Sequence, residues 1–146
     1  MEIEIEDLKY EDIEECYEMN MKVFNENRDL EEIKELYKKY SENKDMYRFL
    51  VAKLNGKIVG YTSAIIAYNL FDANHSFMTL WWVCTHPDYR RQGVATKLFK
   101  AIDEIAKENK CELIYFISET YRKDAHSFYE KMGYDKEGNK AFKKYL

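Results

Sequence analysis

Three consecutive segments constrain the fold more than any other part of the sequence. Residues 76–84 are rich in aromatic and β-branched side chains, residues 94–109 place apolar side chains at helical spacing, and residues 113–117 form a short apolar run. Two strands that are joined through a helix pair in parallel, with a right-handed crossover. We therefore expect residues 76–84 and 113–117 to be parallel neighbours in a sheet.

The strands before this unit should be antiparallel. Residues 47–54 and 57–68 are also of strand type, and Asn55-Gly56 between them is a strong signal for a two-residue hairpin. A second turn at Asp72-Ala73-Asn74 leads into residues 76–84. Short turns join antiparallel neighbours, so the middle of the chain predicts three antiparallel strands.

The first 40 residues predict a strand and two helices. Ile3 and Ile5 alternate with glutamates, which is the period of a half-buried strand. Asp12 is placed to cap a first helix, whose apolar positions are Ile13, Cys16, Tyr17, Met21 and Phe24. A second helix is marked by Leu30, Ile33, Tyr37 and Tyr40.

The last part of the chain predicts one more helix and a final strand. The helix has its apolar positions at Ala125, Phe128, Tyr129 and Met132, and Gly133 ends it. A turn at Glu137-Gly138-Asn139 precedes a strand over residues 141–146. The complete order is βααβββαβαβ, an α/β (α+β) fold around a mixed, mostly antiparallel central sheet.

Length and composition indicate one domain over residues 1–146. A chain of 146 residues, 46% of them hydrophobic, can bury one core, and no glycine-, serine- or proline-rich linker divides it. No apolar run reaches the roughly 20 residues of a membrane span, so we expect a soluble, cytoplasmic protein without a membrane partner. Three cysteines beside three histidines, without ligand spacing, argue against disulfides and a metal site. The net charge of −4 argues against nucleic acid.

Residues 90–96, Arg-Arg-Gln-Gly-Val-Ala-Thr, predict an anion site. They stand immediately before and in the first turn of a helix, where backbone N–H groups lack helical partners and the helix dipole favours negative charge. Gly93 lets a ligand approach the backbone, and Arg90 and Arg91 supply charge. The loop follows the carboxyl end of the strand at which the sheet turns parallel, and ligands of open sheets bind at such junctions. Both arguments place a phosphate group here.

Two motifs resemble those of the GNAT superfamily of N-acyltransferases, which use acetyl-CoA or a related acyl-CoA. Residues 85–95 are similar to the family's pyrophosphate loop, Gln/Arg-x-x-Gly-x-Gly/Ala, with Arg90, Gly93 and Ala95 at its fixed positions. Residues 125–134 are similar to its second signature, a helix with Phe-Tyr followed by Gly and an aromatic residue. The resemblance implies the GNAT-like fold, with a splayed parallel pair of strands at the cofactor site.

The resemblance also implies which residues bind acetyl-CoA. The backbone near Val83, Cys84 and Thr85 would hold the pantetheine arm and face the thioester carbonyl, beside a local bulge. Phe128 would pack beside the arm. The pyrophosphate would be held by the cations of Arg90 and Arg91 and by the N–H groups of Gln92, Gly93, Val94, Ala95 and Thr96.

Tyr129 is the candidate catalytic residue, as general acid to the departing thiolate, because a phenol can donate its proton at neutral pH. Arg122 stands where many members have asparagine, and residues 76–84 carry no carboxylate, although many members have a glutamate there as base. The base is therefore open between His75, Asp72, His86 and a water held by backbone carbonyls. Trp81 and Trp82 should point to opposite faces of their strand.

The main hypothesis is an acetyl-CoA-dependent N-acetyltransferase without a metal. Its acceptor would be a primary amine of a small molecule (polyamine, amino sugar, antibiotic or amino acid) or of a protein. A non-catalytic acyl-CoA-binding or sensing domain is the alternative, and a nucleoside-triphosphate enzyme is disfavoured because no Gly-x-x-x-x-Gly-Lys-Ser/Thr loop is present. Similar proteins are often dimers, and the last strand could pair with that of a second copy.

Overall fold

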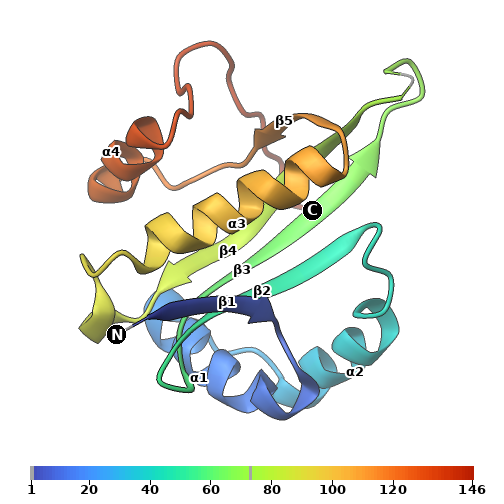
Figure 1. Ribbon diagram of the computed structural model, residues 1–146. Coiled ribbons are helices and arrows are strands. Elements are labelled where there is room, and N and C mark those ends of the chain that lie inside the picture. Colours follow the sequence, from blue (N-terminus) through green and yellow to red (C-terminus); the bar gives the residue numbers. More distant parts are fainter. Residues whose placement is uncertain (1, 73) are drawn as a thin grey trace. The chain divides into compact units, whose positions relative to one another are not determined.

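The computed structural model describes residues 2–72 and 74–146, so Met1 and Ala73, which belongs to a predicted turn, lie outside the described residues. The strands form one five-stranded sheet in the order β1-β2-β3-β4-β5 (Figure 1). They are β1 (Ile3–Asp7), β2 (Tyr47–Leu54), β3 (Lys57–Tyr68), β4 (Ser76–Thr85) and β5 (Cys111–Tyr115). The first three pairs are antiparallel and β4 pairs with β5 in parallel, which confirms the predicted mixed sheet.

Two helices cover opposite faces of this sheet. Helix α1 (Ile13–Phe24) packs Cys16 and Met19 against Val51 and Ile58, whereas helix α3 (Val94–Glu108) packs Val94 against the neighbouring strand residues Ala52 and Val59. Consecutive strand residues point to opposite faces, so we distinguish an α1 face and an α3 face of the sheet. Both helices lie where the apolar spacing predicted them.

The hairpin between β2 and β3 has the predicted two-residue turn. Asn55 and Gly56 have φ angles of 52° and 80°, in the left-handed region that a type I′ turn requires at both positions. Antiparallel pairing runs from Leu54↔Lys57 to Tyr47↔Ile65, with a register shift between Ala52 and Lys53. The turn therefore sets the register of the residues next to it, up to this shift.

Gly60 on β3 allows α3 to lie close to the sheet. A Cβ atom at this position would stand 2.8 Å from Cγ1 of Val94 and 3.3 Å from Cβ of Ala52. Real Cβ contacts are longer, so any larger residue would displace the first turn of α3 or the strand beneath it. The position of the helix N-terminus thus depends on this glycine.

Asp12 does not cap α1 as the sequence suggested. It occupies the N-cap position without a side-chain hydrogen bond to the helix. Instead its Oδ2 accepts a 2.6 Å bond from Nζ of Lys53, which also lies 2.7 Å from Oε1 of Glu6. The hydrogen bonds to Asp12 and Glu6 raise the pKa of Lys53 above its ordinary value. Asp29 does cap α2 (Leu30–Tyr40), since its Oδ1 accepts from the Glu32 N–H.

The chain separates into two compact units, Met1–Tyr115 and Phe116–Leu146. The second unit contains α4 (Lys123–Lys131), followed by Gly133 with a φ of 95°, as predicted for a helix that stops at glycine. None of its described residues forms a strand, so the predicted final strand over residues 141–146 is wrong. A bend at residues 136–138 overlaps the predicted turn, and Oδ1 of Asp135 accepts from the N–H groups of Glu137 and Gly138.

The failed strand has a physical reason. A strand is stable only when a neighbour takes its backbone hydrogen bonds and covers one of its faces. Phe142 and Tyr145 are 94% and 81% exposed, so the aromatic residues of this segment bury no face.

The helices of both units are also too short or too polar for a membrane span. Among the described residues, no helix is long and apolar enough to cross a membrane.

Candidate functional site

The first turn of α3 offers unpaired backbone donors. Its N-cap is Gly93, in the left-handed region with a φ of 86°, and no side chain caps the helix. The Lys97 N–H donates to the Gly93 carbonyl, which is the first hydrogen bond of the helix. The N–H groups of residues 94–96 therefore have no carbonyl partner within the helix. The first turn carries no acidic residue, which leaves its positive dipole end uncompensated by protein charge.

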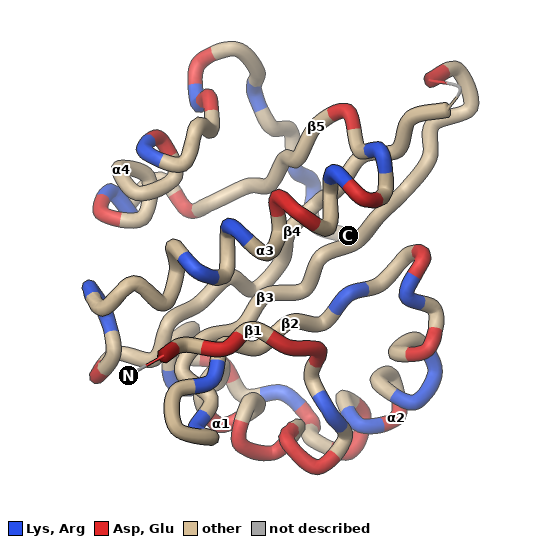
Figure 2. The backbone as a smooth tube through the Cα atoms, viewed as in Figure 1, with Lys and Arg blue, Asp and Glu red and all other residues tan. Residues whose placement is uncertain are grey.

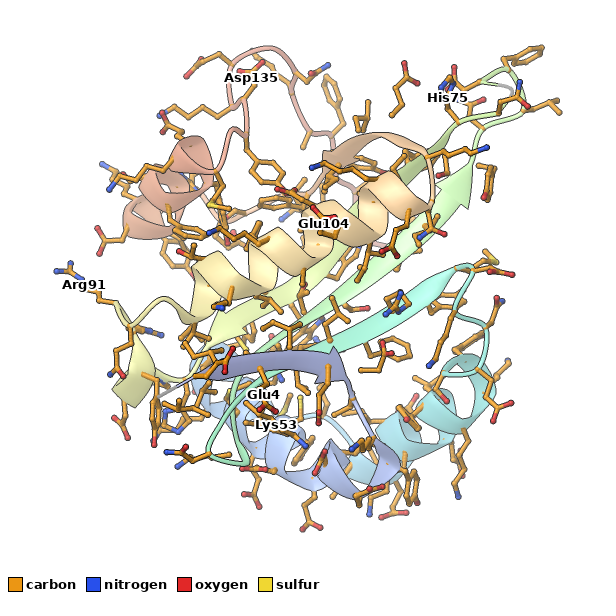
Figure 3. All side chains as sticks on the ribbon, viewed as in Figure 1. Glu4, Lys53, His75, Arg91, Glu104 and Asp135 are labelled. Carbon is orange, nitrogen blue, oxygen red and sulfur yellow. The ribbon has the colours of Figure 1, made fainter. Side chains whose placement is uncertain are left out.

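A short structured loop presents two arginines before this helix. Pro87–Tyr89 form the 3-10 turn η2, whose first N–H bond goes from Asp88 to Nδ1 of His86. Arg90 and Arg91 follow and are exposed, and Arg91 has a left-handed φ of 62°. Figure 3 shows the Arg91 side chain extending away from the helix start, and Figure 2 shows Lys and Arg positions along the loop and the first half of α3. The loop is therefore a basic region in an acidic chain.

Burial limits what two of the predicted site residues can contribute. The side chains of Val94 and Cys84 are 1% and 3% exposed and belong to the cores on the two faces of the sheet. Only their backbone groups are available to a ligand. Ala95, Thr96 and Thr85 are half-buried, and Gln92 and Gly93 are exposed.

One edge of β4 is open beside this helix start. β4 pairs with β5 from Ser76↔Cys111 to Thr79↔Tyr115, and no strand of the described residues pairs with that edge over residues 80–85. An extended ligand could add to such an edge as a further strand. The parallel pair thus ends before the part of β4 that contains Val83, Cys84 and Thr85.

A bulge lies in the same part of β4. The pairing with β3 shifts between Tyr61↔Cys84 and Ser63↔Trp81, and Trp82 has a φ of 59°, which is unusual for a bulky residue. Tyr61 packs on the α1-face core, so Ser63 and its partner Trp81 face the same side. Trp82 also lies on that side, with its ring centroid 4.9 Å from that of Phe24 on α1. The expectation that the two tryptophans point to opposite faces is therefore wrong, because the bulge interrupts the alternation.

The structure separates the candidate bases. Asp72 and His75 lie at the turn before β4, and His75 is labelled in Figure 3 at the end of the sheet opposite to Arg91. At about 3.3 Å per residue, the bulge at Trp82 is roughly 20 Å away from His75. His86 follows β4 directly, but its Nδ1 accepts the Asp88 N–H and its ring lies 5.3 Å from that of Tyr89.

A buried polar network beneath the bulge was not foreseen. Nδ2 of Asn20 donates to the Cys16 carbonyl at 2.8 Å, and the Cys84 thiol lies 3.4 Å from Oδ1 of the same asparagine. Burial raises the pKa of Cys16 and of Tyr61, so both stay neutral at ordinary pH. These groups hold α1 against the bulge and are not suited to act as bases. No sequence pattern signals such a network, because its members come from distant segments.

In the second unit, Tyr129 belongs to an aromatic cluster. Its ring centroid lies 4.7 Å from that of Phe116, 5.9 Å from that of Phe128 and 6.4 Å from that of Tyr134. Tyr129 is 9% exposed. Arg122 occupies the N-cap position of α4, and Nε2 of His126 lies 3.2 Å from Oγ of Ser118. The cluster fixes the orientation of the Tyr129 ring within this unit.

No group of three or more His, Cys, Asp or Glu side chains could hold a metal ion among residues 2–72 and 74–146.

The fold resembles those of several solved structures. A transcriptional regulator from Bacillus halodurans has 24% identity and a TM-score of 0.89, over 99% of this chain and 100% of that chain. Glucosamine-6-phosphate N-acetyltransferase from Arabidopsis thaliana has 17% identity and a TM-score of 0.82, over 100% and 98%.

An aminoglycoside acetyltransferase from an uncultured soil metagenomic sample has 20% identity and a TM-score of 0.80, over 99% of this chain and 95% of that chain. A comparison with curated proteins gives no significant match. The model of the acetyltransferase (GNAT) family matches residues 11–134, which include the open edge of β4, the loop before α3 and the helix with Tyr129. The chain therefore belongs to the GNAT family of acetyltransferases and is an acyltransferase.

Proposed function

We propose that this protein transfers the acetyl group of acetyl-CoA to a primary amine of a small molecule or a protein. The observation that carries the proposal is the uncapped, acid-free first turn of α3 beside the open, bulged edge of β4. A diphosphate fits the first feature and an extended amide chain fits the second. Coenzyme A contains both chemical groups, and membership of the family supports the same donor.

The pyrophosphate would bind the N–H groups of residues 92–96, with the Thr96 hydroxyl as a further donor. Arg90 and Arg91 add positive charge at the same point. The backbone of Val83, Cys84 and Thr85 would bond the pantetheine arm, and Phe128 would pack beside that arm. The exposed left-handed backbone at Arg91 and Gly93 supports this assignment, because successive N–H groups in such conformations form anion-binding concavities.

The reaction needs a neutral amine, a site for the developing oxyanion and a proton for the leaving thiolate. The amine nitrogen attacks the thioester carbonyl, whose oxygen would accept a hydrogen bond from the backbone N–H near Val83. Collapse of the tetrahedral adduct breaks the carbon–sulfur bond, and Tyr129 would protonate the sulfur. The proton of the attacking amine would go to His86 or to a water held by backbone carbonyls, since Asp72 and His75 lie far from the bulge.

The acceptor class includes polyamines, amino sugars, antibiotics and amino acids. Two of the similar structures are an amino-sugar phosphate and an aminoglycoside acetyltransferase by name, which supports small-molecule amines. The absence of a carboxylate on β4 is the observation that favours the alternative, an acyl-CoA-binding domain that has lost its activity.

Thiol release from acetyl-CoA in the presence of a panel of amines tests the proposal. We expect acetyl-CoA binding in calorimetry, and amine-dependent thiol release that mass spectrometry matches to an N-acetylated product. Binding of acetyl-CoA without product from any amine would support the binding domain instead. Absence of acetyl-CoA binding would refute both functions.

A further inference from the structure

The two faces of the sheet at the β4 bulge offer different surroundings. On the α3 face, the first turn of α3 packs on Ala52 and Gly60, so the proposed diphosphate site belongs to that side. On the α1 face, the bulge is covered by the end of α1 and the segment that follows it, which bring Phe24 and Arg28 to Trp82. With the diphosphate on the α3 side, the α1 side of the bulge is the face left to the attacking amine.

Arg28 is held firmly at this place. Its guanidinium carbon lies 5.4 Å from the centroid of the Trp82 ring, on which it rests as a cation on an aromatic face. Its carbonyl accepts a 2.7 Å hydrogen bond from the Tyr17 hydroxyl, and its N–H donates to the sulfur of Met21. Both backbone groups and the side chain therefore have partners before any ligand binds, which lowers the entropic cost of binding.

The polar edge of this guanidinium remains available. The Arg28 side chain is 57% exposed, and within residues 2–72 and 74–146 it forms one ion pair, a 3.4 Å approach of Nε to Oε2 of Glu26. No described residue accepts a hydrogen bond from its two terminal nitrogens. A guanidinium fork of this kind binds a carboxylate or phosphate through two parallel N–H bonds. The exposed pair with Glu26 contributes little and can be exchanged for such a ligand.

We propose that Arg28 is a specificity-determining residue that binds an anionic group of the acceptor, a carboxylate or a phosphate, while the amine of the same molecule reaches the bulge. The inference rests on the proposed acetyltransferase function and narrows it to amino acids, amino-sugar phosphates or similar zwitterions. Polyamines and aminoglycosides, whose charged groups are all positive, would be disfavoured by the guanidinium. Trp82 acts as the support on which the cation is placed.

Matched acceptor pairs test this inference. Phenylalanine is compared with phenethylamine and with phenylalanine amide for the carboxylate, and glucosamine 6-phosphate with glucosamine for the phosphate. In the native enzyme, we expect the anionic member of at least one pair to have a KM about 10- to 100-fold lower, the size expected for a charge-assisted bidentate contact. The pair that shows the difference identifies which oxyanion is bound.

Three variants separate recognition from structure. Arg28→Gln should raise the KM of the anionic acceptor about 10- to 100-fold, with the KM of its neutral partner and of acetyl-CoA unchanged. Glu26→Gln should lower the KM of the anionic acceptor, because it releases the guanidinium from its protein partner. Lys39→Gln is the control, since Lys39 is also a cation over a ring, that of Tyr40, but at the end of α2.

The outcomes distinguish failure of the proposed acetyltransferase function from failure of the role given to Arg28. If no amine supports thiol release, the proposed function is refuted and the inference falls with it. If amines are acetylated but the native enzyme has the same KM for the anionic and neutral members of both pairs, the inference alone is refuted. It is also refuted if Arg28→Gln affects anionic and neutral acceptors equally, because Arg28 would then only fasten the segment after α1 to Trp82.

Discussion

Gly93 has a left-handed backbone conformation and also belongs to the proposed diphosphate site. Its φ of 86° is strained for any side chain, although no protein atom would contact a Cβ there. Gly93→Val should therefore raise the acetyl-CoA KM at least tenfold, because both the helix start and the space for the diphosphate change. Gly93→Ala should give a smaller increase in the same direction. Steady-state kinetics with varied acetyl-CoA concentration measures both KM values. An unchanged KM for the valine variant would show that the loop does not bind acetyl-CoA.

Tyr129 can be tested against a neighbour in its own aromatic cluster. Tyr129→Phe keeps the ring that contacts Phe116 but removes the proposed acid, so kcat should fall about 10- to 1000-fold with little change in the acetyl-CoA KM. Tyr134→Phe removes a hydroxyl from the same cluster and should leave kcat within a few fold. Equal losses in the two variants would show that the cluster supports the fold and that Tyr129 has no proton-transfer role.

Single residues also show where prediction from sequence ends. Asn55-Gly56 and Gly133 were correctly interpreted because a turn or a helix end requires a left-handed backbone within two or three residues. Trp82 adopts the same backbone region without any local signal, at a bulge in the pairing with β3 and with its ring against Phe24, which is far away in the sequence. The need for glycine at position 60 likewise cannot be predicted from the neighbouring residues, because it arises from the packing of α3 on β3.

At the scale of elements, the contact between α3 and β3 links stability to the donor site. Gly60→Ala places a methyl group 2.8 Å from Val94 and should lower the free energy of unfolding by about 1–3 kcal/mol. It should also raise the acetyl-CoA KM, because the first turn of α3 moves. In Gly60→Ala/Val94→Ala the clash with Val94 is removed, so the acetyl-CoA KM should rise less in the double variant than in Gly60→Ala alone. Urea unfolding and kinetics give both quantities, and additive effects on KM would contradict the coupling.

Lys53 joins β2 to β1 and to the turn η1 (Tyr10–Asp12), which leads into α1. Lys53→Gln should reduce the free energy of unfolding by about 2 kcal/mol at neutral pH, as expected for lost hydrogen bonds to charged groups. Because folding raises the pKa of Lys53, its contribution is fully present below the ordinary value of 10.5 and is lost as pH rises above it. The difference between the two proteins should therefore be constant from pH 7 to about 10 and shrink beyond that.

The exposed pair of Lys107 with Glu104 on α3 is the control for this experiment. Lys107→Gln should change the free energy of unfolding by less than about 0.5 kcal/mol, because surface ion pairs are weak. A Lys53→Gln effect as small as this would mean that the ion pairs with Glu6 and Asp12 do not stabilise the sheet edge.

Elements defined by periodicity were predictable, and those that need a partner were not. The helix of residues 94–108 and the two long strands around Asn55-Gly56 have enough repeats to identify their type. The parallel strand was placed two residues too late, at 113–117 in place of Cys111–Tyr115, since a five-residue run has no clear ends. The last strand was predicted wrongly because the aromatic residues of 141–146 do not show whether a neighbouring strand covers them.

At the scale of the whole molecule, an acidic chain with a net charge of −4 carries its basic loop at one end of α3 (Figure 2). The donor proposed for this loop is polyanionic, so its binding has to be specific enough to overcome the repulsion of the rest of the chain. Binding of such a ligand to the folded state alone stabilises the whole first unit by mass action. This stabilisation can be observed through residues far from the loop.

Cys16 is a suitable reporter, because it is 4% exposed, forms no disulfide and lies in the core on the α1 face. Burial raises its pKa, so the reactive thiolate is scarce until the unit unfolds, whereas the half-buried Cys111 should react first with iodoacetamide. Acetyl-CoA at 100 times its Kd should slow the alkylation of Cys16 about 100-fold, in proportion to the fraction unfolded, and should change that of Cys111 less. Peptide mass spectrometry over time measures both rates. If Cys16 is alkylated rapidly and at the same rate with and without acetyl-CoA, the α1 face opens locally, without unfolding of the donor site.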